Sequence, residues 1–497
     1  MKIVLVSAEI VPFSKTGGMA DVVGALADAL ARAGHRVLTV SPRYGVVDAS
    51  AHGFTDPGIE ARVDVGGHTL RPYYLTRTQG RRTDALVCHP VFDRAGIYGD
   101  RFGSFGDNHL RFALLSRAGI EAARRVPQGR SRLGEDVVFH VHDWHTALVA
   151  VYLNALYRPL GLFSRAPTVL TLHNVAHQGL FDASAFGELE LAPRWLSGWA
   201  LEWHGHLSLL KGGIMQCERL TTVSPTYARE LLQDGGAAGM ELPLRHRHQD
   251  LHGIRNGIDA HTWDPANDPH LDATYSADDL SGKATCKAAL QAELGLPVRA
   301  DAPMAGSVGR LDPQKGVDML IESVPWMVEA HNAQVVVLGS AAASHQRYEA
   351  ALRHLQARYP NHVRACIGFS ERLAHRIEAG ADVFLMPSLF EPCGLNQLYS
   401  LRYGTPPVVR WTGGLADSVQ PYNPTRNTGT GWVFGPAEGP AFREAVHWAL
   451  HTWRNHPSAF RAVQRAGMTQ DLSWDAVVPA YLQVYEAAAA RRGAMPR

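Results

Sequence analysis

Short, continuously apolar runs alternate with amphipathic stretches along this chain. The first run covers residues 2–7, and an unbroken apolar strand of this kind is typical of a parallel sheet covered on both faces. Gly17-Gly18 follows it, and apolar residues then recur at helical spacing over 20–33. A second apolar run covers 35–40. This order predicts a β-α-β unit at the N-terminus.

The same alternation continues along the chain in two series. Further strand-like runs in the first series cover 137–141, 168–172 and 220–223. The second series begins near Asn256 and has runs over 305–308, 334–338, 364–367 and 383–386. Alternating strands and helices predict parallel sheets, whose ligands bind beyond the carboxyl ends of the strands. The predicted fold class is therefore α/β, with two Rossmann-like, doubly wound parallel-sheet domains and an active-site cleft between them.

The break between the two series gives the domain boundaries. Residues 1–255 form the predicted N-terminal domain and residues 256–473 the predicted C-terminal domain. The segment 259–281 is rich in Asp, Ala, His and Pro, which predicts an irregular connection. An amphipathic helical pattern over 474–492 carries Trp474, Val477, Tyr481 and Tyr485.

Length, charge and cysteine content narrow the class of protein. The chain has 497 residues, too many for one ordinary core, and its formal net charge of +1 argues against nucleic-acid or anionic-membrane partners. The first apolar run ends at Glu9 and is too short for a secretory signal or a membrane span. The five cysteines are scattered without a C-x-x-C pair. We therefore expect a cytoplasmic protein.

A glycine turn in Ser14-Lys15-Thr16-Gly17-Gly18 lies between the first strand and the first helix. Glycines at this place let backbone N–H groups approach an anion, and the dipole of the following helix favours negative charge. The turn is not G-x-G-x-x-G, so NAD binding is not indicated. An ordinary glycine turn with a solvated lysine is the alternative.

Polar residues end two strands of the first series. His140, His142 and Asp143 resemble a metal-ligand cluster. Successive strand residues point to opposite faces, so His140 and His142 share one face and Asp143 points away. A polar cleft wall is favoured over a metal site for this reason. His173 and Asn174 end the next strand of the same sheet, at the edge where ligands bind.

Two loops of the second series carry charges that suit a sugar nucleotide. Arg310 and Lys315 lie between a strand and a helix, where two cations and a helix N-terminus could hold a diphosphate. A capped turn with surface charges is the alternative, since Asp312 precedes a proline. Glu391 precedes the helical run 397–403 and could bind sugar hydroxyls and stabilise positive charge. No D-x-D occurs, which weakens any metal-dependent mechanism.

These motifs together resemble the bacterial glycogen synthases and plant starch synthases. The matching stretches run in the family's order across nearly the whole chain: 15–26 (KTGGMADVVGAL), 142–145 (HDWH), 173–179 (HNVAHQG), 223–230 (VSPTYARE), 256–259 (NGID), 309–318 (GRLDPQKGVD) and 390–419 (FEPCGLNQLYSLRYGTPPVVRWTGGLADSV). Departures from the usual residues are Met19, Leu389 and Asn396, and the segments 185–209 and 233–250 match poorly. Tyr399 stands where related retaining glycosyltransferases often have a second glutamate, as is usual for glycogen synthases.

The resemblance implies transfer of glucose from ADP-glucose to the non-reducing end of an α-1,4-glucan such as glycogen, with retention of configuration. It implies a GT-B fold whose acceptor-side N-terminal domain is completed by the C-terminal helix 474–497, and whose C-terminal domain binds the nucleotide sugar. No cofactor and no metal are expected. The residues implied in catalysis are Glu391, His173, Lys15 and Asp143. Those implied in substrate binding are Lys15, Gly17, Gly18, Asp21, Trp144, Asn174, Asn256, Arg310, Lys315, Phe369, Cys393, Gly394, Leu395 and Asn396.

More specific roles follow from the same resemblance. Arg310 and Lys315 would bind the diphosphate, and Phe369 would lie against adenine. Glu391 would hold the glucose ring with the Cys393 and Gly394 backbone, the Cys393 thiol being alternatively a small buried group. His173 and Asn256 would contact glucose hydroxyls, while Asp143 and Trp144 would line the donor–acceptor region.

Two other functions stay open from the residues alone. One is a retaining glucosyltransferase of the sucrose or trehalose type that uses UDP-glucose. The other is a non-catalytic glucan-binding protein, against which the set Lys15, His173, Arg310, Lys315 and Glu391 argues, since binding alone needs no leaving-group site. The sequence predicts no particular oligomeric state.

Overall fold

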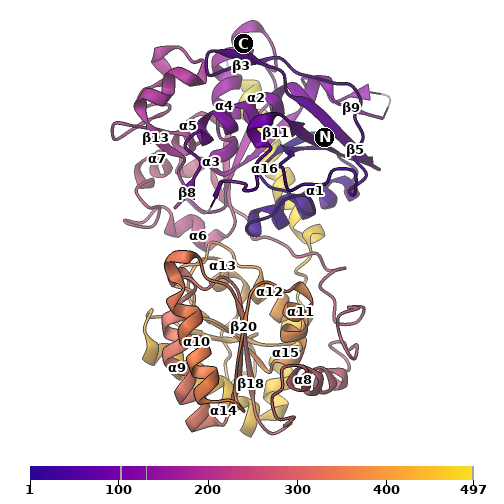
Figure 1. Cartoon of the computed structure of the whole chain (residues 1–497), viewed down its shortest axis with the longest axis vertical. Helices are drawn as coiled ribbons and strands as arrows, with labels where there is room; N and C mark the ends of the chain where they lie inside the picture. The colour runs from indigo at the N-terminus through magenta and orange to yellow at the C-terminus, as the bar shows by residue number, and fades with distance from the viewer. Residues whose placement is uncertain (101–102, 130, 495–497) are drawn as a thin grey trace. The chain divides into compact units, whose positions relative to one another are not determined.

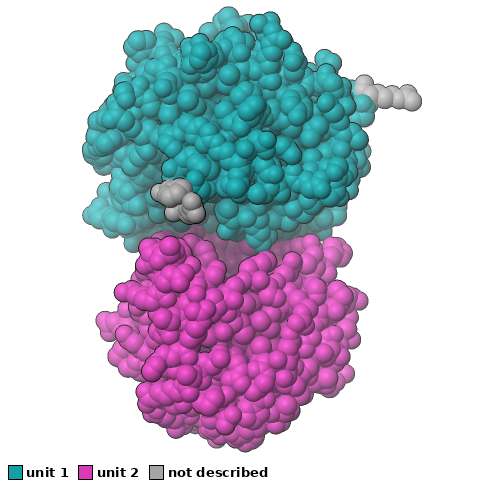
Figure 2. Space-filling view, viewed as in Figure 1, with its two compact units in different colours: residues 1–256, 474–497 teal, residues 257–473 magenta. Residues whose placement is uncertain are grey.

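The computed structural model describes residues 1–100, 103–129 and 131–494, and the chain forms two compact units (Figures 1 and 2). Unit 1 comprises Met1–Asn256 together with the C-terminal segment that begins at Trp474, and unit 2 comprises Gly257–Ser473. Asn256, expected to open the second domain, is thus the last residue of the first long segment of unit 1. No helix of the described residues is both long and apolar enough to cross a membrane.

An eight-stranded sheet forms the centre of unit 1, in the order β17-β16-β12-β11-β1-β2-β6-β5. Its strands are β1 Lys2–Val6, β2 Arg36–Pro42, β5 Tyr73–Gln79, β6 Arg82–Cys88, β11 Val138–His142, β12 Thr168–Leu172, β16 Arg219–Thr222 and β17 Leu251–Gly253. Neighbours pair in parallel except at the edge, where β5 runs antiparallel to β6. The apolar runs of the first series are confirmed as strands, whereas β5, β6 and β17 were not expected.

Helices cover this sheet on its two faces. They are α1 Gly18–Arg32, α2 Asn108–Arg125, α3 Asp143–Thr146, α4 Leu148–Tyr152, α5 Leu209–Gln216, α6 Pro225–Glu230, α7 Glu241–His246 and α16 Trp474–Ala494. A small antiparallel sheet has the order β13 Leu180–Asp182, β15 His206–Ser208, β14 Glu202–Trp203, and β14 and β15 lie within the segment 185–209 that matches the family poorly.

The helix α16 returns the chain to unit 1 after unit 2 is complete, and it is yellow in Figure 1. Its apolar side is buried at Trp474, Val477, Tyr481 and Tyr485, as the pattern predicts. The Tyr485 hydroxyl lies 2.8 Å from Nδ1 of the fully buried His140. This contact gives a polar partner to a buried ring nitrogen that would otherwise have none, which would be costly.

A six-stranded parallel sheet forms the centre of unit 2, in the order β20-β19-β18-β21-β22-β23. Its strands are β18 Met304–Val308, β19 Gln334–Gly339, β20 Val363–Ile367, β21 Val383–Met386, β22 Pro407–Arg410 and β23 Trp432–Phe434. Its helices are α8 Ser281–Glu293, α9 Val317–His331, α10 Arg347–Arg358, α11 Glu371–Gly380, α12 Asn396–Arg402, α13 Gly413–Ser418, α14 Gly439–Asn455 and α15 Pro457–Met468. This is the doubly wound strand order of Rossmann-like folds, and the predicted fold class is confirmed for each unit.

We expect Gly119→Ala to destabilise unit 1, because α2 packs directly against β1 at this glycine. An added Cβ would lie 2.9 Å from Cγ1 and 3.0 Å from Cγ2 of Val6, closer than a packed core accepts. The free energy of unfolding should fall by about 1–3 kcal/mol, measured by urea denaturation. Gly493→Ala is the control, since a Cβ there meets nothing within 4 Å. Equal urea midpoints for the two variants would contradict the packing argument.

Candidate active site

Each parallel sheet reverses its strand order at its first strand, and the loops leaving that point carry the expected site residues. In unit 1 the reversal lies between β1 and β11, and in unit 2 between β18 and β21. Loops at such a switch point diverge and leave a crevice in which ligands of open α/β sheets bind. Each unit therefore brings one group of the expected site residues to the carboxyl edge of its own sheet.

The loop after β1 carries Lys15 and leads into α1. Lys15 Nζ lies 2.7 Å from Asp21 Oδ1, and 46% of the lysine side chain is exposed. A pair this exposed contributes little to stability, so its lysine can exchange partners with an anion at small cost. Gly17 caps α1 with extended backbone and makes no side-chain capping bond. The structure thus brings Lys15, Gly17, Gly18 and Asp21 together at one helix N-terminus.

The end of β11 is joined to the end of β12 by two hydrogen bonds. Asp143 Oδ1 accepts from the His173 backbone N–H at 2.7 Å, and His142 Nδ1 lies 3.0 Å from His173 Nε2. Asp143 holds left-handed backbone, with φ at 54°. That conformation is uncommon outside glycine and is often found at functional sites. His173 is thereby fixed from two sides.

His140 and His142 share one face, as strand alternation predicts, with ring centroids 4.3 Å apart. His140 nevertheless lies outside the candidate site, since its Nε2 is 2.6 Å from Thr171 Oγ1 and its Nδ1 contacts Tyr485. Across the part of the chain that the structure describes, no group of three or more His, Cys, Asp or Glu side chains is arranged to hold a metal ion.

Burial disfavours the charged form of a side chain, so it shifts the pKa values of Asp143 and His173 in opposite directions. It raises the pKa of Asp143 to about 7 and lowers the pKa of His173 to about 3. At neutral pH the His173 ring is therefore uncharged and can donate from one nitrogen and accept at the other. Such a ring suits sugar hydroxyls better than phosphate.

Two expected residues of unit 1, Trp144 and Asn174, have other contacts. Trp144 is 9% exposed and packs on Phe112, and a Cβ on Gly179 would lie 2.5 Å from its ring. Trp144 is thus buried and packed against the loop that carries Gly179, and its role in lining the donor–acceptor region stays a prediction. Asn174 Oδ1 accepts from the Ala176 N–H within its own loop.

Asn256 differs from both, because its polar group is buried without a protein partner. The residue is 3% exposed, and its Oδ1 has no hydrogen-bond donor among the described residues. Buried polar atoms are almost always paired, so an unpaired oxygen at a candidate site fits a ligand that brings its own donor. A sugar hydroxyl has that chemistry.

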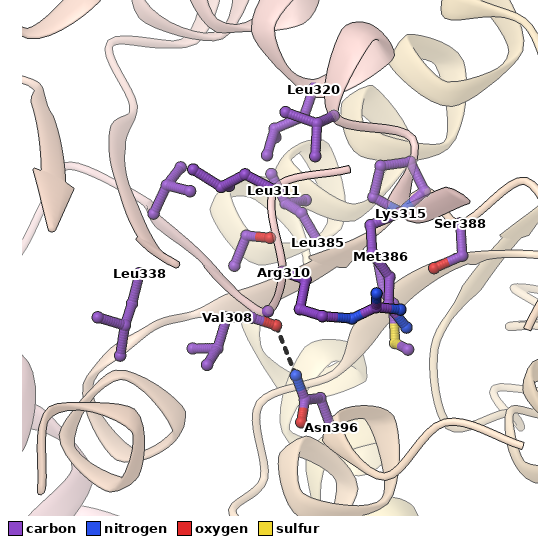
Figure 3. Close-up of a pocket in the computed structure, with 15 residues that line it drawn as sticks. Val308, Arg310, Leu311, Lys315, Leu320, Leu338, Leu385, Met386, Ser388 and Asn396 are labelled. Atoms are coloured by element: carbon purple, nitrogen blue, oxygen red, sulfur yellow. Dashed lines mark hydrogen bonds between the residues drawn. The ribbon is translucent and has the colours of Figure 1, made fainter. Parts of the chain in front are cut away.

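A pocket in unit 2 lies over the ends of β18 and β21 (Figure 3). Arg310, Lys315, Ser388 and Asn396 are among its lining residues. Asn396 Nδ2 donates to the Val308 carbonyl at 2.5 Å, which ties the start of α12 to the end of β18. The expected cations and the expected α12 residue are thus brought to one place.

The turn that carries the two cations also has a structural cap. Asp312 Oδ1 accepts from the Lys315 N–H at 3.2 Å. The turn is therefore capped, and this cap is compatible with a role of Arg310 and Lys315 in binding a diphosphate. Gly316 has a positive φ of 66°, and a Cβ there would lie 2.0 Å from the Pro387 carbonyl oxygen. Only glycine fits, which holds Lys315 beside the loop after β21.

Glu391 is the buried acid of this pocket edge. Its Oε2 lies 2.5 Å from Lys315 Nζ and accepts from Ser388 Oγ at 3.1 Å. The exposed fractions are 7% for the Glu391 side chain and 24% for the Lys315 side chain. Arg310 is 64% exposed and pairs with Asp312 at 3.0 Å. Lys315 and Glu391, expected on different parts of a donor, are in direct contact.

The segment after Glu391 rests on the glycine turn before α13. A Cβ on Gly413 would lie 2.0 Å from the Glu391 carbonyl oxygen, and one on Gly414 would lie 2.2 Å from the Cys393 carbonyl oxygen. Cys393 is 5% exposed, and Gly394 has a φ of 73°. Leu395 packs into a small apolar cluster beneath α12.

Two contacts within the candidate site were not anticipated. Glu9 binds Thr16 beside Lys15, and Ser388 binds Glu391. A lone charge ending an apolar run was the available signal for Glu9, and no signal marked Ser388.

Phe369 is 82% exposed, as a platform for a flat ring would be, and it is absent from the lining of the unit 2 pocket.

Comparison with known proteins places this chain among glucan-building enzymes. Residues 2–246 match the family model described as starch synthase catalytic domain, and residues 295–466 match glycosyl transferases group 1. The chain is 45% identical to the glycogen synthase of Anaeromyxobacter sp. strain Fw109-5 over 492 residues, covering 99% of this chain and 100% of that one. It is 41% identical to soluble starch synthase 1 of Solanum tuberosum over 97% of this chain and 78% of that protein.

Among solved structures, the catalytic domain of starch synthase IV from Arabidopsis thaliana, bound to ADP and acarbose, is similar throughout. The TM-score is 0.89 at 32% identity, and the match covers 98% of this chain and 99% of that one. The two-sheet architecture described above is therefore shared over the full length of both chains.

We expect Asp143→Asn to change how stability depends on pH. The folded pKa of about 7 lies above the ~3.9 of an unfolded carboxyl, so the folded protein holds this proton more tightly. The contribution of Asp143 to stability therefore falls as pH rises from about 4 to 7. The asparagine keeps an acceptor oxygen and cannot ionise. Between pH 4 and 7, the free energy of unfolding of the variant should therefore rise by up to about 4 kcal/mol relative to that of wild type.

Urea unfolding of both proteins at pH 4, 5.5 and 7 measures this difference. The buried histidines have lowered pKa values, which makes stability rise with pH in both proteins, so their titration cancels in the subtraction. A stability difference that stays constant with pH would contradict the raised pKa of Asp143.

Proposed function

The chain belongs to the family of bacterial glycogen synthases and plant starch synthases, and from this we propose that it transfers glucose from ADP-glucose to the non-reducing end of an α-1,4-glucan such as glycogen. It is a glucosyltransferase with a nucleotide-sugar donor and a glucan acceptor. The ADP bound to the similar starch synthase IV supports adenine as the base. Retention of configuration follows as part of the same proposal.

The contact between Lys315 and Glu391 carries the proposal for unit 2. It places a cation and a buried carboxylate side by side at the switch point of a Rossmann-like sheet. A departing nucleoside diphosphate needs positive charge, and the sugar carbon that it leaves needs negative charge. Lys315 and the exposed Arg310 supply the first, and Glu391 supplies the second. Charges already in place stabilise a transition state without reorganisation at the moment of reaction.

The order of events follows from these charges. The bond between the glucose C1 and the diphosphate oxygen lengthens, and its electron pair moves to the phosphate that Arg310 and Lys315 neutralise. Glu391, with its Oε2 held by Ser388, faces the positive charge that develops on the sugar. The 4-hydroxyl of the acceptor then bonds to C1, and its proton passes to the oxygen of the departing diphosphate.

In unit 1 we assign sugar recognition to His173, Asp143 and Asn256, and donor contact to Lys15 with the glycines before α1. Asp143 holds the His173 backbone and His142 holds Nε2 of its ring, so the neutral ring offers its other nitrogen, Nδ1, to a hydroxyl group. Asn256 adds an oxygen that has no protein donor among the described residues.

We also place the enzyme in the cytoplasm. No disulfide joins any of its five cysteines in the described part of the chain, and four of the five are buried. Free cysteines are typical of proteins from reducing compartments.

The donor is tested by transfer of radiolabelled glucose to glycogen, run separately with ADP-glucose and UDP-glucose at equal concentration. We expect kcat/KM to be at least about tenfold higher with ADP-glucose, which is a difference of about 1.4 kcal/mol in transition-state binding. A preference for UDP-glucose would replace the proposed donor. Transfer from neither donor would remove the proposed function.

We expect Glu391→Gln to lower kcat by about 10²–10³-fold, the loss typical of one electrostatic contact in a transition state. The amide keeps the shape of the side chain but loses its charge, so the binding of ADP measured by calorimetry should change much less. Glu322→Gln, at an exposed position on α9 of the same unit, serves as the control for loss of a carboxylate. A Glu391→Gln enzyme with near-native kcat would leave Glu391 with a positioning role only.

A further inference from the structure

Glu9 is a buried carboxylate at the switch point of unit 1 whose partners are all uncharged. It follows β1 and is 3% exposed. Its Oε2 accepts from the Thr16 N–H, and its Oε1 accepts from Thr16 Oγ1 at 2.7 Å and from the Tyr98 hydroxyl at 2.6 Å. No lysine or arginine of the described residues forms an ion pair with it. Burying a charge is costly unless hydrogen bonds replace its hydration, and here three donors do so.

The first of these contacts fixes the loop that carries Lys15. Both the main chain and the side chain of Thr16 bind Glu9, so the residue between Lys15 and Gly17 is held at two points. Gly17 offers no side chain, and α1 has no side-chain cap. Backbone bonds between Ile10 and Ser14 close the earlier part of the loop, and Val11 N–H donates to the Ala20 carbonyl of α1 at 3.2 Å. Glu9 adds the contact that fixes Thr16, the residue that joins Lys15 to the glycines before α1.

The second contact reaches the turn after β11. Burial and the nearby Glu9 charge raise the pKa of Tyr98 well above its usual value, so its hydroxyl remains a donor. The Tyr98 ring stacks on His145 at 4.7 Å between centroids, and His145 lies against Trp144 at 4.1 Å. These two residues belong to α3, whose first residue is Asp143. One carboxylate thus connects both loops that leave the switch point of unit 1.

We propose that Glu9 is a positioning residue for glucosyl transfer, which places the Lys15 loop and, through Tyr98, the turn that bears Asp143. This inference rests on the proposed function, because it requires that Lys15 and Asp143 act on the substrates. Glu9 itself is buried behind Thr16 and acts through it. A displacement of about 1 Å in a positioned catalytic group can cost about 10²-fold in rate.

The test compares Glu9→Gln with a buried glutamate that makes the same local contact elsewhere in unit 1. Glu218 is 1% exposed, and its Oε2 accepts from both the N–H and the Oγ1 of Thr168 at 2.6 Å. Thr168 begins β12, at the edge of the sheet opposite to the site loops. Glu218 also pairs with Arg158 and Arg492, so Glu218→Gln removes at least as many contacts as Glu9→Gln and shows what such a loss does to folding away from the site loops.

We expect both variants to lower Tm, and only Glu9→Gln to lower kcat/KM for ADP-glucose by about 10–100-fold per folded molecule. Activity is measured at a temperature at which circular dichroism shows both variants to be folded, with glycogen saturating. Thr16→Val, which removes the hydroxyl donor to Glu9, should lower kcat/KM in the same direction. Thr16→Ser restores that donor and should stay within about threefold of wild type.

Equal kcat/KM for wild type, Glu9→Gln and Thr16→Val would overturn the proposal and leave Glu9 with a folding role. Losses of the same size in Glu9→Gln and Glu218→Gln would overturn it as well. If Glu9→Gln does not fold, the comparison of Thr16→Val with Thr16→Ser decides alone. A wild-type enzyme that transfers glucose from neither ADP-glucose nor UDP-glucose defeats the proposed function, an outcome distinct from these.

Discussion

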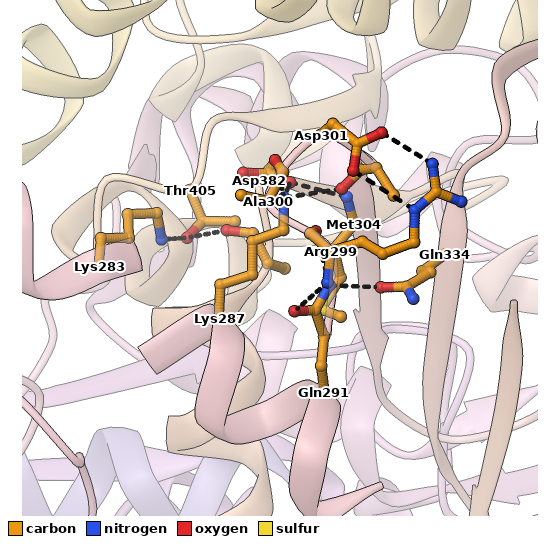
Figure 4. A network of polar contacts seen from close by, with 12 residues as sticks. Lys283, Lys287, Gln291, Arg299, Ala300, Asp301, Met304, Gln334, Asp382 and Thr405 are labelled. Atoms are coloured by element: carbon orange, nitrogen blue, oxygen red, sulfur yellow. Dashed lines mark hydrogen bonds and ion pairs between the residues drawn. The ribbon is translucent and has the colours of Figure 1, made fainter. Parts of the chain in front are cut away.

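Main-chain N–H groups in both units donate hydrogen bonds to carboxylate side chains, and these bonds hold the ends of strands in place. At the start of β12, Glu218 accepts from Thr168, and at the start of β18, Asp382 accepts from Met304 at 2.7 Å. Figure 4 shows the second case, where Asp382 also binds Lys287 of α8 at 2.6 Å. The N–H of the first residue of a strand can lack an acceptor in the neighbouring strand, and the carboxylate supplies one. The carboxylate thereby also links the strand to a helix or to a second strand.

The same contact recurs at the carboxyl ends of strands in unit 1, where it shapes the site. Glu9 accepts from Thr16, and Asp143 accepts from His173. Burial makes losing one of these hydrogen bonds expensive. Loops that carry substrate-binding groups usually gain precision from a rigid scaffold. Here the scaffold reaches the loops through two carboxylates that need not touch a substrate themselves.

The apolar pattern of the sequence located the central strands of both sheets and the order of the two series, but not β5, β6, β17, β22 or β23. The run 168–172 coincides with β12, because a strand buried on both faces is apolar throughout. The edge strand β5 escaped notice, since its pattern is half exposed and largely polar. The site shows the same division: motifs located Lys315 and Glu391, but their ion pair depends on two loops 76 residues apart. Trp144 lies in a matching motif, and only its neighbours in space reveal that it is buried.

The position of α16 has a consequence for how the protein is made. The ring of His140 is buried early in the first sheet, yet its partner Tyr485 follows 345 residues later. Ribosomes release the chain from its N-terminus, and domains that are continuous in sequence can fold while synthesis proceeds. Unit 1 is not continuous, so its sheet must wait for the whole of unit 2 before the last helix covers it. During that interval the apolar surface that α16 covers remains open, and Nδ1 of His140 lacks its partner while Nε2 already contacts Thr171.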